Sequence, residues 1–157
     1  MKIALLGYGT VGRGVDQIIR DRVGSVEVAR ILELPDRLSD PRMTSDYNEI
    51  VSDPDIDLVV ECMGGVEPAH TFIMRALASG KHVVTSNKAV VAAHFAEFAE
   101  AALYNRVSLF IEASVGGGIP WIAGIEKARR IDEISSFKGI MNGTTNYIVY
   151  QMLKDGA

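Results

Sequence analysis

Short apolar runs alternate with longer segments of helical periodicity along the first 130 residues. The apolar runs have the length of strands, and they predict strands at residues 2–6, 26–32, 56–60, 82–85 and 107–111. The intervening and following segments predict helices at residues 11–21, 47–51, 68–79, 89–103 and 121–130. Strands that alternate with helices are joined by crossover connections, so the pattern predicts an α/β fold with a doubly wound parallel sheet.

Two segments of this first part differ in pattern from each other. The helix predicted at residues 11–21 places four apolar residues on one face: Val11, Val15, Ile18 and Ile19. Residues 33–46 are polar and contain two prolines, so this segment is predicted to be a loop.

The pattern changes near residue 131. Residues 134–141 loosely predict a strand, a turn follows at residues 142–145, and a last helix is predicted from about residue 146 to 154. We therefore expect one domain at residues 1–130 and the truncated beginning of a second at residues 131–157.

Composition and charge exclude several classes of protein. The chain has 157 residues with a net charge of −4, and its basic residues are scattered, which argues against a nucleic-acid partner. No apolar run reaches the roughly 18 residues of a membrane helix, and the first 20 residues lack the pattern of a signal peptide. The single cysteine, Cys62, excludes an intrachain disulfide and fits a reducing cytoplasm.

The first predicted strand runs directly into a glycine-rich turn that opens a helix. The turn is Gly7-Tyr8-Gly9-Thr10-Val11-Gly12. In a Rossmann-type dinucleotide fold, Gly7 allows the tight turn, Gly9 lets the backbone approach a pyrophosphate, and Gly12 lets helix and strand pack closely. The alternative is a glycine-rich surface turn without a ligand.

Three turns follow the carboxyl ends of predicted strands, at residues 7–12, 61–65 and 85–88. Ligands of open parallel sheets bind outside these ends, so the three turns are expected to line one crevice.

The choice of cofactor depends on the end of the second predicted strand. Glu33 lies about 20 residues after Gly12, where an acid accepts from a ribose 2′-hydroxyl and repels a 2′-phosphate. This favours NAD. Arg30 and Arg37 lie nearby and could instead hold the 2′-phosphate of NADP, or Glu33 is simply a solvated loop residue.

Lys88 is the best catalytic candidate. A cation at the mouth of the crevice can polarise a substrate oxygen or move its proton. The alternative is a lysine at a helix start that contacts phosphate or water. Asn87 can cap the following helix without any ligand.

Residues 112–120 combine Glu112 with three consecutive glycines. A carboxylate beside exposed carbonyls is a ligand set for a hard cation, although a hinge between domains explains the glycines equally well.

The histidines His70, His82 and His94 are too widely spaced along the sequence to predict a metal site. Cys62 is interpreted as a small core side chain.

Taken together, five blocks resemble homoserine dehydrogenases, in the order of that family. They are Gly7-Tyr8-Gly9-Thr10-Val11-Gly12, Glu61-Cys62-Met63-Gly64-Gly65, Thr85-Ser86-Asn87-Lys88-Ala89, Glu112-Ala113-Ser114-Val115-Gly116-Gly117-Gly118-Ile119-Pro120 and Gly139-Ile140-Met141-Asn142-Gly143-Thr144-Thr145-Asn146-Tyr147. The resemblance implies NAD(P)-dependent interconversion of L-homoserine and L-aspartate 4-semialdehyde, in the biosynthesis of threonine, methionine and isoleucine.

The resemblance also implies roles for individual residues. Cofactor contacts are expected from Gly7, Tyr8, Gly9, Thr10, Val11, Gly12, Glu33, Gly64, Ser86, Asn87, Lys88 and Gly143. A sodium ion is expected at Glu112 and at the carbonyls of Val115, Gly117 and Ile119.

The chain ends before the segment in which the family carries its substrate-binding carboxylates and a second catalytic lysine. We therefore expect an amino-terminal fragment that binds cofactor but turns over little or no homoserine. The intact protein is expected to be a cytoplasmic homo-oligomer. The competing interpretations are an oxidoreductase of the glucose–fructose oxidoreductase type and a nucleotide-sensing module without catalysis.

Overall fold

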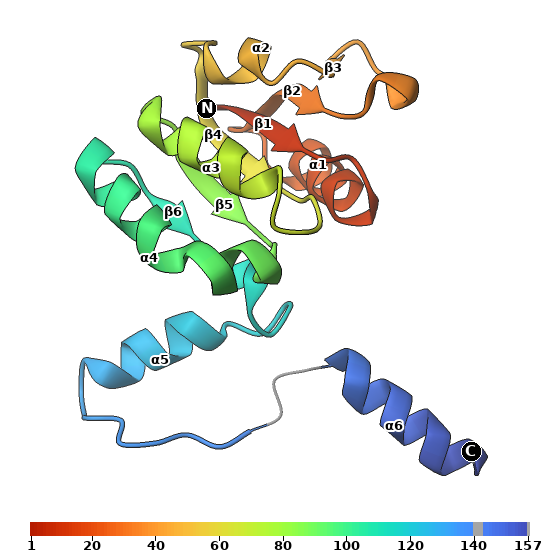
Figure 1. The fold of residues 1–157 in the computed structure, drawn as a ribbon, viewed down its shortest axis with the longest axis vertical. Helices are drawn as coiled ribbons and strands as arrows, with labels where there is room; N and C mark the ends of the chain where they lie inside the picture. Colours follow the sequence, from red (N-terminus) through yellow and green to blue (C-terminus); the bar gives the residue numbers. More distant parts are fainter. Residues whose placement is uncertain (140–142, 157) are drawn as a thin grey trace. The chain divides into compact units, whose positions relative to one another are not determined.

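The computed structural model describes residues 1–139 and 143–156. Contacts within the chain group it into two compact units, Met1–Ile111 and Glu112–Ala157 (Figure 1). The structure thus groups residues 112–130 with the later part of the chain, whereas the sequence assigned them to the first domain. The functional boundary near residue 130 stays a prediction.

The first unit is built on a six-stranded sheet in which all neighbouring strands are parallel. The strands are β1 (Lys2–Leu6), β2 (Glu27–Leu32), β3 (Met43–Thr44), β4 (Ile56–Glu61), β5 (His82–Thr85) and β6 (Leu109–Phe110). Their order is β3-β2-β1-β4-β5-β6, so the direction of winding reverses between β1 and β4. This is the order of a Rossmann fold and confirms the predicted fold class.

Helices cover both faces of this sheet. They are α1 (Thr10–Arg22), α2 (Asn48–Val51), α3 (Ala69–Ala78) and α4 (Lys88–Asn105), with a 3₁₀ turn η1 (Pro35–Arg37). Alternate residues of β1 separate the two cores: Ile3 and Leu5 pack on the α1 side, whereas Ala4 and Leu6 pack on the side of α2, α3 and α4.

Two expectations about this unit were wrong in detail. The predicted loop at residues 33–46 contains β3, whose Met43 pairs with Ile31 at the edge of the sheet. A strand of two residues, set among prolines and charged residues, is too short to show the periodicity of a strand. On α1, Val11 and Ile18 are 51% and 55% exposed, so they do not belong to the buried face.

The second unit contains the 3₁₀ turn η2 (Glu112–Ser114), α5 (Trp121–Arg129) and α6 (Gly143–Asp155). Residues 134–139 form no strand, contrary to the prediction, and residues 140 and 141 lie outside the described part. A strand needs a neighbour for its backbone groups, and the described residues of this unit supply no strand to pair with.

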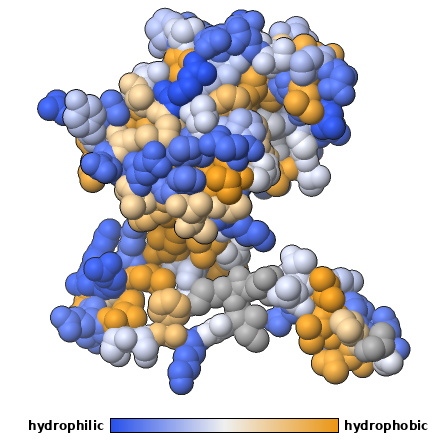
Figure 2. All heavy atoms as spheres, in the orientation of Figure 1, coloured by the Kyte–Doolittle hydropathy of each residue, from blue (hydrophilic) through white to orange (hydrophobic). Residues whose placement is uncertain are grey.

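Several apolar side chains of α6 are exposed (Figure 2). No helix in the described part of the chain has both the length and the apolar character to cross a membrane.

Candidate dinucleotide-binding site

The turn after β1 has the geometry that its glycines predict. Gly7 has a φ of +92°, which disfavours any residue with a side chain. A Cβ added to Gly12 would lie 2.1 Å from the carbonyl oxygen of Gly7, so only glycine fits there. A Cβ at Gly9 would meet nothing within 4 Å. The tight turn and the close approach are therefore confirmed, and contact of Gly9 with a pyrophosphate stays a prediction.

The turn delivers the chain into the N-terminus of α1. Thr10 is the first residue of this helix, and its first turn contains no acidic side chain. The first N–H groups of a helix lack helical acceptors, and the helix dipole makes this end positive. An incoming phosphate therefore meets N–H donors and no competing carboxylate from that turn.

The three turns predicted to line one crevice do lie side by side. The amide of Gly7 donates to the Leu32 carbonyl at 3.0 Å, and that of Cys62 donates to the Leu6 carbonyl at 2.9 Å. The amide of Ser86 donates to the Glu61 carbonyl at 3.2 Å. These bonds join the carboxyl ends of β2, β1, β4 and β5, which form a row along one end of the sheet. The winding reverses within this row, between β1 and β4.

A hollow of about 410 Å³ opens beside the glycine turn. It is lined by Tyr8, Gly9, Arg13, Glu33, Arg37, Ser39 and Met43. The Glu33 carboxylate accepts the backbone N–H groups of Tyr8 and Leu34, both at 2.9 Å. Glu33 is thus fixed at the wall of the hollow, as the ribose-binding interpretation requires, and is not a freely solvated side chain.

The sequence interpretation missed an ion pair between Asp16 and Arg42 that also contacts Tyr8 of the glycine turn. Asp16 of α1 has a fully buried side chain and accepts two hydrogen bonds from the Arg42 guanidinium, at 2.9 and 3.0 Å. The Tyr8 hydroxyl also donates to Asp16, at 2.5 Å. The bonds from Arg42 hold the pKa of Asp16 below its usual value, although burial opposes them. Asp16 and Arg42, together with the Tyr8 hydroxyl, therefore connect α1, the glycine turn and the start of the edge strand β3.

A second buried carboxylate holds the other two turns. Glu61 ends β4 with no exposed surface and accepts from the Thr85 hydroxyl, the Met63 amide at 2.7 Å and the Asn87 side chain at 3.4 Å. Burial raises the pKa of Glu61, and these hydrogen bonds only partly offset the effect. The sequence showed Glu61 at a strand end, but it gave no sign that Thr85 and Asn87 are its partners.

Replacing Glu61 by alanine should lower the free energy of unfolding by about 3–5 kcal/mol. Two buried hydrogen bonds and one part-buried hydrogen bond are lost, and each buried donor left without an acceptor costs about 1–3 kcal/mol. Urea unfolding measures the change, and a loss under about 1 kcal/mol would contradict this role.

The variant Glu61→Gln tests the charge of this carboxylate separately. The pKa of Glu61 is raised by folding, so its stabilising contribution is complete below the unfolded-state pKa and is lost as pH rises through the folded-state pKa. The wild-type protein should therefore lose stability relative to Glu61→Gln as the pH rises from the unfolded-state pKa of Glu61 to its folded-state pKa. A pH-independent difference between the two proteins would contradict the raised pKa.

The turn after β5 presents Lys88 at the start of a capped helix. The Asn87 side chain accepts from the amides of Ala89 and Val90, at 3.2 and 3.3 Å, which confirms it as the N-cap of α4. Its amide group donates to the Gly65 carbonyl at 2.6 Å, so the cap also fixes the turn after β4. Lys88 follows as the first residue of α4 and is exposed. Its contact with a cofactor or substrate stays a prediction.

Cys62 lies under the glycine turn. Its carbonyl oxygen would be 3.3 Å from a Cβ at Gly7. Burial raises the pKa of its thiol to about 11, so the side chain stays protonated at neutral pH. This agrees with a packing role.

In the second unit, the carboxylate of Glu112 accepts from the amides of Ile122 and Ala123, at 2.9 and 3.0 Å, at the N-terminus of α5. Gly116 and Gly117 have φ values of +72° and +62°. The Ile119 carbonyl accepts from the Trp121 amide at 2.8 Å. The Glu112 carboxylate and the Ile119 carbonyl are thus engaged in backbone hydrogen bonds, and cation binding by this loop stays a prediction. Gly143, predicted near the cofactor, is the first residue of α6.

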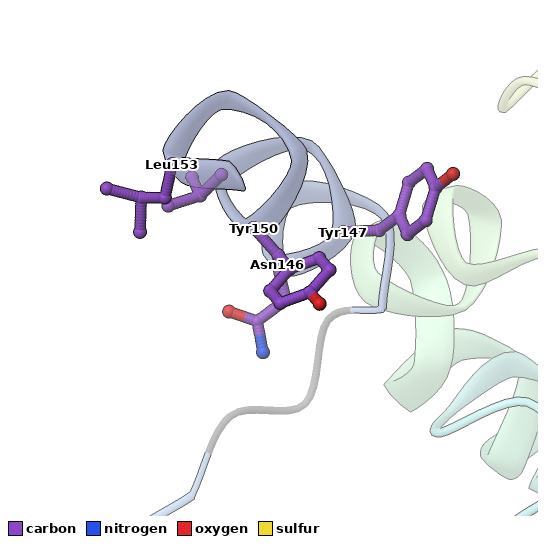
Figure 3. A pocket seen from close by; sticks show the side chains of 5 residues that line it. Asn146, Tyr147, Tyr150 and Leu153 are labelled. Carbon is purple, nitrogen blue, oxygen red and sulfur yellow. The ribbon is translucent and has the colours of Figure 1, made fainter. Parts of the chain in front are cut away.

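A second hollow, of about 450 Å³, lies along α6 (Figure 3). Its described lining consists of Asn146, Tyr147, Val149, Tyr150 and Leu153, all from this one helix. In ligand pockets, polar groups from several elements point toward one place. This hollow is lined by one helix alone, so we interpret it as the apolar side of α6 rather than as a ligand site.

The histidines are widely spaced along the sequence, but the fold brings two of them together, a contact that the sequence did not predict. His70 and His94 lie far apart in sequence, but their rings stack with centroids 4.0 Å apart. Together with Glu97 they could hold a metal ion.

Known proteins resemble this chain over both units. Residues 7–112 match the family model described as homoserine dehydrogenase, NAD binding domain, and residues 120–157 match the one described as homoserine dehydrogenase. A homoserine dehydrogenase from Synechocystis sp. is 45% identical over 169 residues, which cover the whole chain and 39% of the relative. One from Corynebacterium glutamicum is 40% identical over 99% of the chain and 38% of the relative.

Solved structures agree with these matches. A homoserine dehydrogenase from Thiobacillus denitrificans superposes with a TM-score of 0.90 and 37% identity, over all of this chain and 39% of that one. A hyperthermophilic archaeal homoserine dehydrogenase in complex with NADPH gives a TM-score of 0.66 and 26% identity, over 78% of this chain and 46% of that one.

The chain spans about two fifths of the length of the curated relatives described here. The matches nevertheless run through both units, and the first covers the glycine turn, the crevice described above and every strand of the sheet except β1. From its sequence and its fold, this chain belongs to the homoserine dehydrogenase family.

Proposed function

We propose that this chain is the cofactor-binding part of an NAD(P)-dependent oxidoreductase that interconverts L-homoserine and L-aspartate 4-semialdehyde. The observation that carries the proposal is the meeting of three turns where the sheet reverses its winding, in a chain of this family. The glycine turn and the N-terminus of α1 would hold the pyrophosphate, and Glu33 would accept from the adenosine ribose.

Bound nicotinamide would accept or deliver the hydride. Lys88 would hold the substrate oxygen and stabilise the negative charge that develops on it. Asn87 would position Lys88 by capping α4, and Glu61 would hold the turn from which both residues project.

The direct test is cofactor reduction by the intact enzyme with L-homoserine, using NAD and NADP in parallel. We expect reduction of at least one cofactor that depends on homoserine. A nucleotide-sensing module would bind the dinucleotide without reducing it, and an enzyme of the glucose–fructose oxidoreductase type would require a sugar.

The fixed position of Glu33 supports a preference for NAD over NADP. The variant Glu33→Gln should raise the affinity for NADPH relative to NADH by about tenfold or more, equivalent to about 1.4 kcal/mol of lost repulsion. Fluorescence titration with both cofactors measures the ratio. Glu27→Gln, at the opposite end of β2, is the matched control. An unchanged ratio in Glu33→Gln would refute the ribose contact.

Glu112 and the carbonyls of Val115, Gly117 and Ile119 are proposed to bind sodium in the intact enzyme. One carboxylate among neutral carbonyls suits a monovalent ion better than magnesium, which demands near-octahedral oxygen geometry. Replacing sodium by a bulky organic cation at equal ionic strength should lower activity and thermal stability. If Glu112→Gln responds to this exchange as the wild type does, the loop is only a hinge.

We also propose that the intact enzyme acts in the cytoplasm as a homo-oligomer. Cys62, the one cysteine of these 157 residues, has a thiol that burial keeps protonated, and this supports a reducing compartment. A nucleic-acid partner remains unexpected on the basis of the scattered basic residues.

A further inference from the structure

Four side chains meet where α3 packs against α4: Glu67, His70, His94 and Glu97. Nδ1 of His70 lies 3.0 Å from Oε1 of Glu67, and Nε2 of His70 lies 3.0 Å from Oε2 of Glu97. The same Glu97 oxygen lies 3.2 Å from Nδ1 of His94. Glu97 therefore faces one nitrogen from each imidazole.

The packing beneath these side chains fixes their positions. Phe98 is fully buried, and its ring lies 5.6 and 6.1 Å from the rings of His70 and His94. The backbone of α4 leaves helical geometry at one residue, His94, with φ of −132° and ψ of 15°.

Two imidazoles and one carboxylate are a ligand set for zinc and related divalent metals. Ligand atoms about 2.0–2.2 Å from a tetrahedral zinc are about 3.3–3.5 Å apart. Two of the three separations, 3.0 and 3.2 Å, are already near this value, and all three ligand atoms lie within 4.8 Å of one another. A small rotation of the histidine rings would complete the set.

Glu67 adds the outer support that such sites commonly have. A carboxylate that accepts from one ring nitrogen of a metal-binding histidine fixes its tautomer and leaves the other nitrogen free for the metal. Glu67 at Nδ1 of His70 would leave Nε2 for the ion. The side chains of His70, His94 and Glu97 are 21%, 30% and 48% exposed, so an ion can enter from solvent and water can fill the fourth position.

We propose that His70, His94 and Glu97 form a binding site for a divalent transition metal of the zinc class, with Glu67 as a positioning residue. The site is separate from the proposed sodium loop, because it uses other residues and nitrogen ligands. A bound ion would connect α3 to α4 close to the turn that carries Lys88. Its first effect would be to stabilise the folded state, since it binds residues brought together only by folding.

The test is zinc titration of the full-length protein without a histidine tag, followed by nitrogen-detected NMR of the histidine rings. Nε2 of His70 and Nδ1 of His94 should shift on binding one equivalent of zinc. His82, whose Nδ1 accepts from the Ser108 amide at 2.9 Å, should not shift and serves as the internal reference.

Variants then assign the ligands. His94→Gln and Glu97→Gln should each weaken zinc binding by at least the roughly 10- to 100-fold that loss of an outer partner costs, and Glu67→Gln should fall in that range. Glu100→Gln, an exposed acid on the same helix, should leave the affinity unchanged. Zinc should raise the thermal midpoint of the wild type and not that of Glu97→Gln.

The proposal is overturned if zinc at millimolar concentration shifts neither ring, or if Glu97→Gln binds zinc as tightly as the wild type. If the variants unfold, the ring shifts of the wild-type protein alone decide.

Discussion

Replacing Lys88 by alanine should lower the turnover of the intact enzyme by roughly 100- to 1,000-fold, the usual cost of removing one group that stabilises developing negative charge. The lysine starts α4 at the carboxyl end of β5, on a turn fixed by Asn87 and Glu61. The cofactor phosphates are expected at a different turn, so the dissociation constant for the dinucleotide should change far less than kcat.

Steady-state kinetics and cofactor titration, performed on the same preparation, separate the two effects. Lys2→Ala is the matched control, because this exposed lysine begins β1 and pairs with Asp55 at 2.8 Å at the opposite end of the sheet. It should leave kcat unchanged. If Lys88→Ala keeps its turnover and loses only cofactor affinity, Lys88 is a phosphate contact rather than a catalytic residue.

Replacing Gly12 by alanine should abolish measurable dinucleotide binding and lower the free energy of unfolding by about 3 kcal/mol or more. Overpacking typically costs about 1–3 kcal/mol, and here the new Cβ would lie 2.1 Å from a backbone oxygen, where no side chain can rotate away. Either α1 or the turn after β1 must move, and both belong to the proposed pyrophosphate site.

Gly14 provides the comparison, because it lies in the same helix and a Cβ there meets nothing within 4 Å. Gly14→Ala should stabilise the protein by about 0.5–1 kcal/mol, since alanine loses less conformational entropy in a helix. Urea unfolding and NADH titration of both variants form the test. If Gly12→Ala behaved like Gly14→Ala, the close contact with the Gly7 carbonyl oxygen would not be the reason that residue 12 must be glycine.

Local patterns predicted most of the elements because their signals lie within a few neighbouring residues. The strand of residues 2–6, the glycine turn and the cap at Asn87 are examples, and the structure has each of them. The errors occurred where the local signal was weak or misleading. β3 has only two residues and forms because Ile31 and Leu32 offer an open edge. The apolar residues at 134–139 suggested a strand, but no partner in the described chain pairs with them.

By itself, then, the sequence determined the alternation of strands and helices, the parallel sheet, the glycine turn and the family. All of these depend on periodicity or on motifs of contiguous residues. Only the tertiary structure decided which polar and charged side chains are paired. Arg42 reaches Asp16 across 26 positions, Thr85 reaches Glu61 across 24, and Glu97 reaches His70 across 27. The physical reason is that the sheet order and the packing of α3 on α4 set these distances, and neither leaves a periodic trace in the chain.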